Sequence, residues 1–471
     1  MTSRQHRPLR LGLLLIALTA ATTLTACPGP QVVVDKPPVE TPVVAPEPTL
    51  PPVPADLIAK SNIEDFEVDG LRVLLKHTKG SPVVALDVYV DGGAANMTPA
   101  TAGVENLALR AATTGGTAKY PRETYNARLE SMASSISATA GRDYATISMN
   151  CVGPFFAATW EIFADVLTAP AFDAAQLEIE RSRVVEQIKA TEEDPDEYVS
   201  VLATELHYAN HPYAIRPIGT EANVAAFTRQ QLADYTKAAL TRKHMMIVVV
   251  GDIDRATIEK VIKTDLAAIP AGDAAAPAMP AAEASPSGVK AVTRELPTNY
   301  IFGFFAAPAP THPDYYAMQV ATSVLRDRLF EEVRTKRNLT YAVSAGLSAR
   351  RSNIGYLYVT TTQPNETIKV MYEEVEKMAT TPLDAKTLED LVATFLTQHY
   401  MALETNSAQA DQLGRAEMLS DGWERSLVFI DMVKQVTPAD VMRVVQKYVK
   451  DVHWGYVGKP EQADDALLKS R

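Results

Sequence analysis

The first patterned residues of the chain predict β-strands. Residues 66–75 alternate apolar and polar side chains around Asp69-Gly70, a dipeptide favoured in two-residue turns, which predicts a β-hairpin. Largely apolar runs at 83–90 and 245–252 are short and predict buried strands. Folded sequence is therefore expected from about Ile63 onward, beginning with a sheet.

After the strand predicted at 83–90, the apolar residues recur at a helical spacing. Gly103 is followed by four small or apolar residues that fall on one face of a helix, namely Val104, Leu107, Ala108 and Ala111. Gly115 and Gly116 then end the pattern, because glycine is typical just past a helix end. This segment is thus predicted to be a helix between a glycine-containing loop and a glycine pair.

The order of predicted elements repeats after an Ala/Pro-rich segment at 268–287, which is typical of a linker. Before it, further strands are predicted at 135–140 and 144–151, and helices at 125–132, 155–167 and 173–191, with another ending near 239. After it come strands at 300–305, 343–347, 356–361 and 452–458, and helices at 315–333, 367–378 and 385–403. We expect an α+β fold of two homologous α/β halves.

The N-terminus is predicted to be a targeting segment rather than part of the fold. Arg4, Arg7 and Arg10 precede an apolar run at 11–18 that is too short to span a membrane. The segment ends in Leu24-Thr25-Ala26-Cys27, which is similar to a bacterial lipobox. That similarity implies cleavage before Cys27, lipidation of the new terminus and a place in the cell envelope, with Pro28 favouring the periplasmic face of the outer membrane. The alternative is an ordinary secretion signal with a chance cysteine.

These features predict six segments. In order, they are a signal peptide at 1–26, a Pro-rich tether at 27–60, a first half at 61–267, the linker at 268–287, a second half at 288–460 and a tail at 461–471.

Composition and charge exclude some partners. Hydrophobic residues make up 46% of the 471 residues and charged residues 22%, which is ordinary for a globular protein. The formal net charge is -12, and removal of 1–26 would make it more negative. An acidic surface argues against nucleic acid and against docking on anionic lipid, because both need clustered Lys and Arg. The one other cysteine, Cys151, is predicted to be a small buried hydrophobe.

Several segments, taken in order, resemble the pitrilysin/insulinase family of zinc peptidases. The first is the strand, loop and helix that lead to Gly103–Arg110, which resembles the family's zinc-binding segment. The others are Gly115-Gly116-Thr117, 143–146, 180–188, His211-Pro212-Tyr213, 249–252 and 326–341. This resemblance implies that each half is a largely antiparallel mixed sheet covered by helices.

The residues that would bind zinc and activate water differ from the family pattern. Active members carry H-x-x-E-H, in which two His grip the metal and the Glu acts as base. Here the corresponding positions are Asn106, Leu109 and Arg110, and the position of the third ligand, usually Glu, is Gln187. Amides bind zinc poorly, Arg repels it and Leu cannot act as a base. We therefore expect no metal and no cofactor in this chain.

A second pair of residues matches the family motif near the end of the resemblance. In split members, one subunit carries zinc and the other supplies an Arg and a Tyr that steady the substrate carbonyl. The matching positions are Arg334 and Tyr341, with Asn338 where Gly is usual. Asn tolerates left-handed backbone, so the turn is expected to survive. The alternative is that Arg334 is a solvated helix residue and Tyr341 a strand residue packed in the core.

His207 and His211 stand four residues apart, with Glu205 near, and this is a spacing that suits a metal on a helix. Pro212 follows at once and tends to end the helix, so these His are predicted to be structural.

Three hypotheses of function follow. The first is a non-catalytic, substrate-binding subunit of a heteromeric envelope peptidase, like the non-zinc subunit of split bacterial members and of mitochondrial processing peptidase. Its partner would be a zinc-bearing insulinase-family subunit, and peptide would be held between the two. The second is a peptide-binding or scaffolding lipoprotein without an enzymatic partner. The third is an active zinc peptidase with unusual ligands.

Overall fold

The computed structural model describes residues 49–272, 278–283 and 285–471. The predicted signal peptide, Cys27 and most of the predicted tether lie outside these residues. Within the tether's described end, Ala55–Lys60 forms the short helix α1. No helix in the described ranges is long and apolar enough to cross a membrane.

The first half contains a six-stranded sheet in the order β1-β2-β6-β3-β5-β4. Its strands are β1 (Ile63–Val68), β2 (Leu71–His77), β3 (Val83–Asp91), β4 (Ser135–Ala140), β5 (Tyr144–Val152) and β6 (Met245–Gly251). The predicted hairpin is confirmed, because Val68 pairs with Leu71 across Asp69 and Gly70. Both turn residues have positive φ, 50° and 82°, as this tight turn requires.

The second half contains a five-stranded sheet in the order β7-β11-β8-β10-β9. Its strands are β7 (Gly288–Thr293), β8 (Asn299–Ala306), β9 (Val343–Leu347), β10 (Ile354–Thr361) and β11 (His453–Gly458). Each sheet has one parallel pair, β2 with β6 and β7 with β11, and every other pair is antiparallel. Apart from β1, the two strand orders match one for one, which confirms two homologous halves with largely antiparallel mixed sheets.

The helices of the first half are α2 (Val104–Thr114), α3 (Arg122–Ser131), α4 (Phe156–Thr168), α5 (Ala174–Glu193), α6 (Pro195–His207), α7 (Glu221–Ala226), α8 (Arg229–Ala239) and α9 (Arg255–Asp265). Among the described residues of this half, α2, α3, α4, α5 and α8 match predicted helices, whereas α6, α7 and α9 were not predicted. Asp194 separates α5 from α6, and its side chain accepts hydrogen bonds from the backbone of Asp196 and Glu197. With Pro195 at the first helical position, this turn stops one helix and starts the next.

The helices of the second half are α10 (Asp314–Leu329), α11 (Pro364–Thr380), α12 (Ala385–Ala402), α13 (Asn406–Leu419), α14 (Arg425–Lys434), α15 (Pro438–Tyr448) and α16 (Asp465–Leu468). The single helix predicted at 315–333 changes instead to a π-helical turn at Phe330–Thr335. In the predicted tail, the Leu468 carbonyl accepts hydrogen bonds from Tyr372 and Trp454, so α16 lies on the second half.

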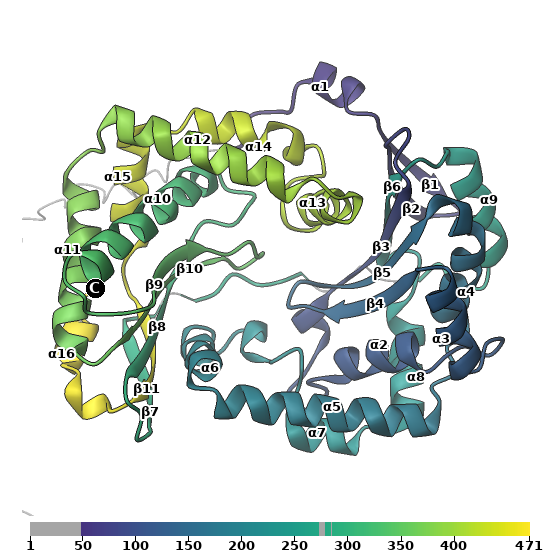
Figure 1. Ribbon diagram of the computed structural model, residues 1–471, viewed down its shortest axis with the longest axis horizontal. Coiled ribbons are helices and arrows are strands. Elements are labelled where there is room, and N and C mark those ends of the chain that lie inside the picture. Colours follow the sequence, from purple (N-terminus) through teal and green to yellow (C-terminus); the bar gives the residue numbers. More distant parts are fainter. Residues whose placement is uncertain (1–48, 273–277, 284) are drawn as a thin grey trace, which may run out of the picture. The chain divides into compact units, whose positions relative to one another are not determined.

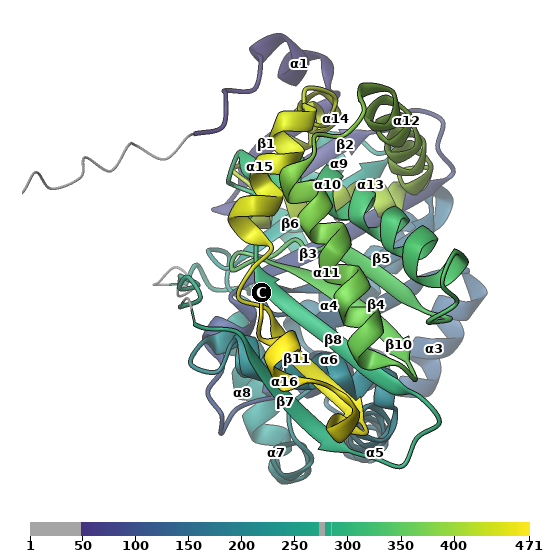
Figure 2. The same cartoon turned by 90° about the vertical axis from the view of Figure 1, so that its left-hand side faces the viewer.

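Each sheet has its main core on one face. In the first half, Trp160 and Phe163 of α4 and Ile258 of α9 pack on the sheet. In the second half, α10, α11 and α15 cover the sheet (Figures 1 and 2). The linker residues 268–287 form no helix or strand where they are described.

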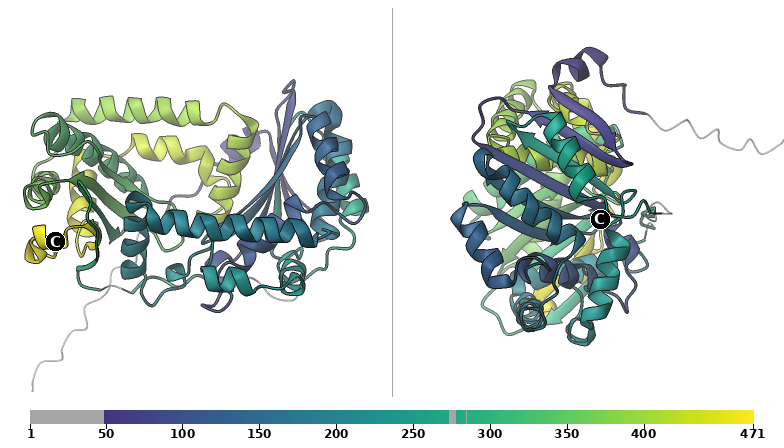
Figure 3. Two further views of the ribbon diagram at one scale, coloured as in Figure 1. Left: turned by 60° about the horizontal axis from the view of Figure 1, so that its bottom comes forward. Right: turned by 90° about the vertical axis from the view of Figure 1, so that its right-hand side faces the viewer.

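The opposite face of each sheet is covered by a helix from the other half. Val199 and Leu202 of α6 pack on Val457 of β11, whereas Leu413 of α13 packs on Tyr89 of β3. Figure 3 shows α5 as the long helix that leads toward α6. The two halves are separate in sequence, but each completes the packing of the other.

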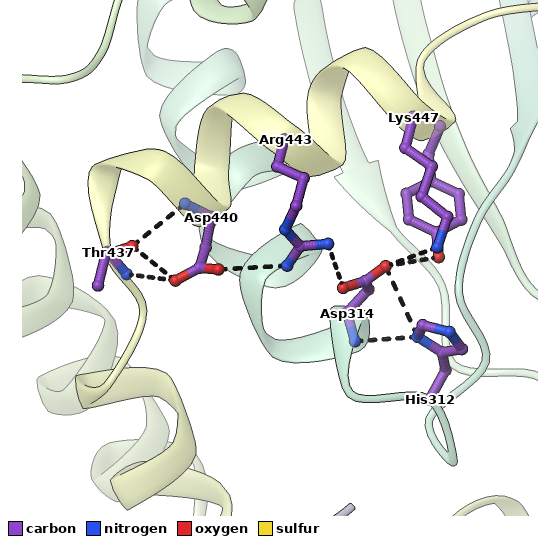
Figure 4. Close-up of polar contacts among 7 residues, drawn as sticks. His312, Asp314, Thr437, Asp440, Arg443 and Lys447 are labelled. Carbon is purple, nitrogen blue, oxygen red and sulfur yellow. Dashed lines mark hydrogen bonds and ion pairs between the residues drawn. The ribbon is translucent and has the colours of Figure 1, made fainter. Parts of the chain in front are cut away.

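A buried carboxylate joins two covering helices of the second half. Asp314 of α10 accepts hydrogen bonds from Arg443 at 2.6 Å, Lys447 at 3.0 Å and Tyr448 at 2.8 Å (Figure 4). Burial alone would raise the pKa of Asp314, but these three donors outweigh it and lower the pKa to about 2. Thr437 and Asp440 cap the same α15 reciprocally. This network holds α15 in register on α10.

Candidate functional site

The four positions predicted from the zinc motif do not all face the same space. Asn106 and Arg110, one turn apart on α2, and Gln187 on α5 line one cavity of about 750 Å³. Leu109 instead lies in the hydrophobic core of the first sheet and is 3% exposed. The position of the family's base is therefore a packing residue that faces away from the cavity.

The cavity lies between the two halves. Its walls come from α2, β4, α5 and α6 of the first half and from β8 and β10 of the second. A volume of this size falls within the usual range for ligand pockets, roughly 300–1,000 Å³.

Arg110 joins α2 to α5 inside this cavity. Its Nε donates to Oε2 of Glu180 at 3.2 Å, and its Nη1 donates to Oε1 of Gln187 at 3.4 Å. The other oxygen of Glu180 accepts from Arg183 at 2.6 Å and from Gln176 at 3.0 Å. The Glu180 side chain is only 2% exposed, so its charge depends on these arginines. A guanidinium thus bridges the two helices that would carry the zinc ligands.

The residues present do not fit zinc. Zinc in proteins is held by His nitrogen, thiolate or carboxylate, whereas Asn106 and Gln187 offer neutral amides and Arg110 offers a positive charge. Among the described residues, no group of three or more His, Cys, Asp or Glu is placed to hold a metal ion. We therefore derive no step through a metal at these positions.

Glu105 is the carboxylate nearest in sequence, and it does not substitute as a ligand. It is 1% exposed and accepts a hydrogen bond at 2.8 Å from Tyr235 of α8. Burial raises the pKa of Glu105 to about 7, and the Tyr235 hydrogen bond opposes that rise. Glu105 therefore belongs to the α2–α8 packing and is absent from the cavity lining.

The cavity lining is positively charged, which the sequence patterns did not indicate. It contains Arg110, Arg142, Arg216 and Arg350 but only one acid, Glu205. Arg142 lies in the turn between β4 and β5, and Arg350 lies in the turn between β9 and β10. Lone arginines in turns carry no periodic signal, and only the fold places them together.

One wall of the cavity is aromatic. Phe302 and Phe304 of β8 lie beside Tyr356 of β10, with ring centroids 5.1 Å apart for the two Phe and 5.3 Å for Phe302 and Tyr356. All three line the cavity. Their spacing of two along β8 already places the two Phe on one face of a strand, so sequence reasoning could have found this wall.

Arg334 and Tyr341 are both exposed, and neither lines the cavity. Arg334 lies on the π-helical turn, with its guanidinium 4.9 Å from the centre of the Phe330 ring. Tyr341 precedes β9 and is 87% exposed, so it is not a core residue. Asn338 has φ of 52°, which confirms that Asn adopts the left-handed turn there. The structure does not bring this pair to Asn106, Arg110 and Gln187.

His207 and His211 both make contacts within the fold, as expected for structural residues. His207 ends α6 and lies 3.1 Å from His453 of β11, measured between their Nδ1 atoms. Burial lowers the pKa of His207 to about 3, with His453 and Arg350 adding to the effect. His211 accepts a hydrogen bond from the backbone of Tyr213 and contacts the carbonyl of Pro280 at 2.8 Å. His207 therefore joins the two halves, and His211 joins the first half to the linker.

Comparison with known proteins supports the same architecture. A family model described as "Insulinase (Peptidase family M16)" matches residues 72–221, and one described as "Peptidase M16 inactive domain" matches residues 226–395. The chain is 22% identical over 400 residues to an uncharacterized zinc protease of Streptomyces coelicolor, a match that covers 80% of this chain and 85% of that protein.

Two further matches extend over most of the chain. It is 20% identical over 408 residues to mitochondrial-processing peptidase subunit beta of Lentinula edodes, covering 81% of this chain and 86% of that protein. The solved structure of a peptidase M16 inactive domain from Pseudomonas fluorescens has a TM-score of 0.77 and 20% identity, covering 84% of this chain and 98% of that one. At that identity the structural likeness shows the fold alone.

Proposed function

Because the chain belongs to the insulinase family of peptidases, M16, we propose that it is a member without a zinc site of its own that holds peptide between its two halves. In this proposal it is the substrate-binding subunit of a heteromeric zinc peptidase, and the zinc is in the partner. It would be anchored to the cell envelope by a lipid on Cys27.

The observation that carries this proposal is the bridge made by Arg110. A zinc ion would have to displace a guanidinium that already neutralises Glu180 and contacts Gln187. Removing that guanidinium would leave a buried carboxylate with one cation fewer, which is costly. The contacts of Arg110 therefore favour its guanidinium, rather than a metal ion, as the positive charge at this place.

Peptide binding is supported by the strand at the cavity wall. β4 is an edge strand of the first sheet, every residue of it is at least partly exposed, and Ala138, Thr139 and Ala140 line the cavity. An exposed edge offers backbone donors and acceptors to an extended peptide. The aromatic wall opposite would contact apolar side chains.

A partner subunit is supported by two features. One relative is, by its name, a subunit of a larger peptidase. In addition, Tyr341 and Arg334 are exposed on the second half, where a partner's site could reach them. In that assembly the Arg and Tyr would donate to the developing charge on the substrate carbonyl.

The test is an activity assay with a zinc-bearing partner. The chain and an insulinase-family protein with intact H-x-x-E-H from the same envelope are assayed on peptides, separately and mixed. We expect no cleavage by the chain alone, and more cleavage by the mixture than by the partner alone. Arg334→Ala should lower the activity of the mixture by about a hundredfold, as for loss of one oxyanion donor.

Arg326→Ala, which removes an exposed arginine from α10, is the matched control and should leave the activity of the mixture unchanged. The proposal fails if the partner is fully active alone and never associates with the chain. Stoichiometric zinc in the purified chain would instead favour an active peptidase with unusual ligands.

A second candidate is a peptide-binding or scaffolding protein that needs no enzymatic partner. It is favoured by the fact that both walls of the cavity come from this one chain. Peptide binding without any effect on a zinc-bearing relative would support it.

A further inference from the structure

Two arginines in the cavity have no acidic partner. Of the charged lining residues, Arg110 pairs with Glu180, Arg216 with Glu192 at 2.9 Å, and Glu205 with Lys290 at 2.6 Å. Within the described residues, neither Arg142 nor Arg350 forms an ion pair. Among the residues that the structure describes, the cavity therefore contains two arginines without a direct carboxylate partner, and the only acid that acts on Arg142 is the neighbouring Asp143.

These charges are poorly solvated and act on each other. Nη1 of Arg350 is buried and has no hydrogen-bond partner in the described structure. Burial first, and then the positive charge of Arg350, lower the pKa of Arg142 to about 10. A buried charged donor without an acceptor is costly, so an anion placed between the two side chains would stabilise both.

The backbone on either side of both arginines is firmly held. Arg142 donates from Nε to the Tyr213 carbonyl at 3.2 Å, while the neighbouring Asp143 accepts a hydrogen bond from the Tyr213 hydroxyl. Next to Arg350, Arg351 donates to Asp91 at 2.7 Å and to the Met418 carbonyl at 3.2 Å. The two arginines lie in topologically equivalent turns, β4–β5 and β9–β10, so the site is formed where the two halves meet.

The other groups in the cavity fit a peptide rather than an isolated anion. Asn106 lines the cavity, and its buried Oδ1 has no donor in the part of the chain that is described, so a turn of this amide toward the cavity would let it accept a peptide N–H. Phe302 and Tyr356 provide an apolar surface beside it.

We propose that Arg142 and Arg350 bind a carboxylate of a peptide held in this cavity, so that the cavity selects acidic peptides over neutral ones. This inference rests on the proposed peptide-binding function and names its substrate class. The guanidinium forks fit a carboxylate with two parallel hydrogen bonds. Either an Asp or Glu side chain or a free C-terminus supplies this group.

The test measures peptide affinity of the chain alone, without any partner. The probe is a short peptide that carries an uncharged BODIPY dye, with one Phe and one Glu, made with a free or an amidated C-terminus and with Glu or Gln. We expect the form without any of these carboxylates to bind about tenfold or more weakly than the form with both, which corresponds to about 1.4 kcal/mol. The two singly altered peptides show whether the side chain or the C-terminus is bound, and a loss in either one supports the proposal.

Variants link the preference to the two arginines. Arg142→Gln and Arg350→Gln should each reduce the preference for the acidic peptide and leave affinity for the neutral peptide unchanged. Arg350→Lys keeps the charge without the fork and should retain part of the preference. Arg122→Gln, which removes an exposed arginine from the start of α3, should retain all of it. Thermal unfolding of each variant checks that it is folded.

Equal affinity for acidic and neutral peptides would overturn this inference and leave the proposed function standing. Survival of the preference in the Arg142→Gln, Arg350→Gln double variant would also overturn it. If the chain binds neither class of peptide, both the inference and the proposed peptide-binding function fail.

Discussion

Arg110 shows how one charged side chain can join two helices. Its guanidinium lies between α2 and α5 and contacts Glu180 and Gln187, so a fixed charge joins the two helices. Whether residues 106, 109, 110 and 187 suit zinc could be judged from the sequence alone, because the chemistry of a metal ligand depends on residue type. The role of Glu180 as the partner of Arg110 could not, because the two are 70 residues apart.

Glu105 provides a test of the packing beneath this site. Its pKa is raised from 4.5 to about 7, so between these pH values the folded protein holds a proton that the unfolded chain releases. This group therefore makes the free energy of unfolding fall as the pH rises through that window. Glu105→Gln cannot ionise and should be more stable than the wild type at pH 8 by on the order of 2 kcal/mol, with a smaller difference at pH 5.

Urea denaturation at the two pH values measures this difference. Glu123→Gln, an exposed glutamate on α3, is the matched control and should follow the wild type at both. A Glu105→Gln variant whose stability relative to the wild type does not depend on pH would contradict the assignment.

At the scale of elements, α6 and α13 each cover the sheet of the other half. This packing distinguishes the fold from two independent domains. α6 lies so close to β11 that a Cβ at Gly455 would overlap the carbonyl oxygen of Val199, and a Cβ at Gly414 of α13 would overlap the ring of Tyr89. Sequence periodicity predicted most of the strands that these helices cover. It did not indicate which sheet each helix would cover, because an apolar face is compatible with either one.

Gly455→Ala should therefore destabilise the protein. The added methyl group has to displace backbone of α6 rather than a flexible side chain, and overpacking of this kind costs about 1–3 kcal/mol. Gly288→Ala is the control at the same interface, since its Cβ would lie at an ordinary 3.5 Å from Leu206. Urea midpoints compare the two variants, and equal midpoints would show that α6 does not pack tightly on β11.

At the scale of the whole molecule, the two halves together form the cavity whose lining combines α2 and α5 with β8 and β10. If the zinc-binding geometry of the family survives in this frame, ligands should be restorable. Asn106→His, Arg110→His and Gln187→Glu together should give a chain that binds one zinc ion, because the three positions line the same cavity.

The matched control keeps Arg110 and changes only Asn106→His and Gln187→Glu. It should bind no zinc, because the guanidinium repels the ion and one ligand is missing. Metal content after dialysis is the measurement, and Leu109 is left unchanged because it packs in the core. Failure of the folded triple variant to bind zinc would mean that the helices have moved from the family arrangement.

The sequence by itself determined the two repeated halves, most strands, eight of the sixteen helices in the described residues, and the residue types at the positions of the zinc motif. It could do so because hydrophobic period and ligand chemistry are local properties. Only the tertiary structure decided that Arg110 reaches Glu180, that Leu109 faces the core, and that Arg142 and Arg350 line one cavity without acidic partners. These facts depend on which turns and helix faces, far apart in the sequence, become neighbours in the fold. The electrostatic cost of a buried charge depends on those neighbours.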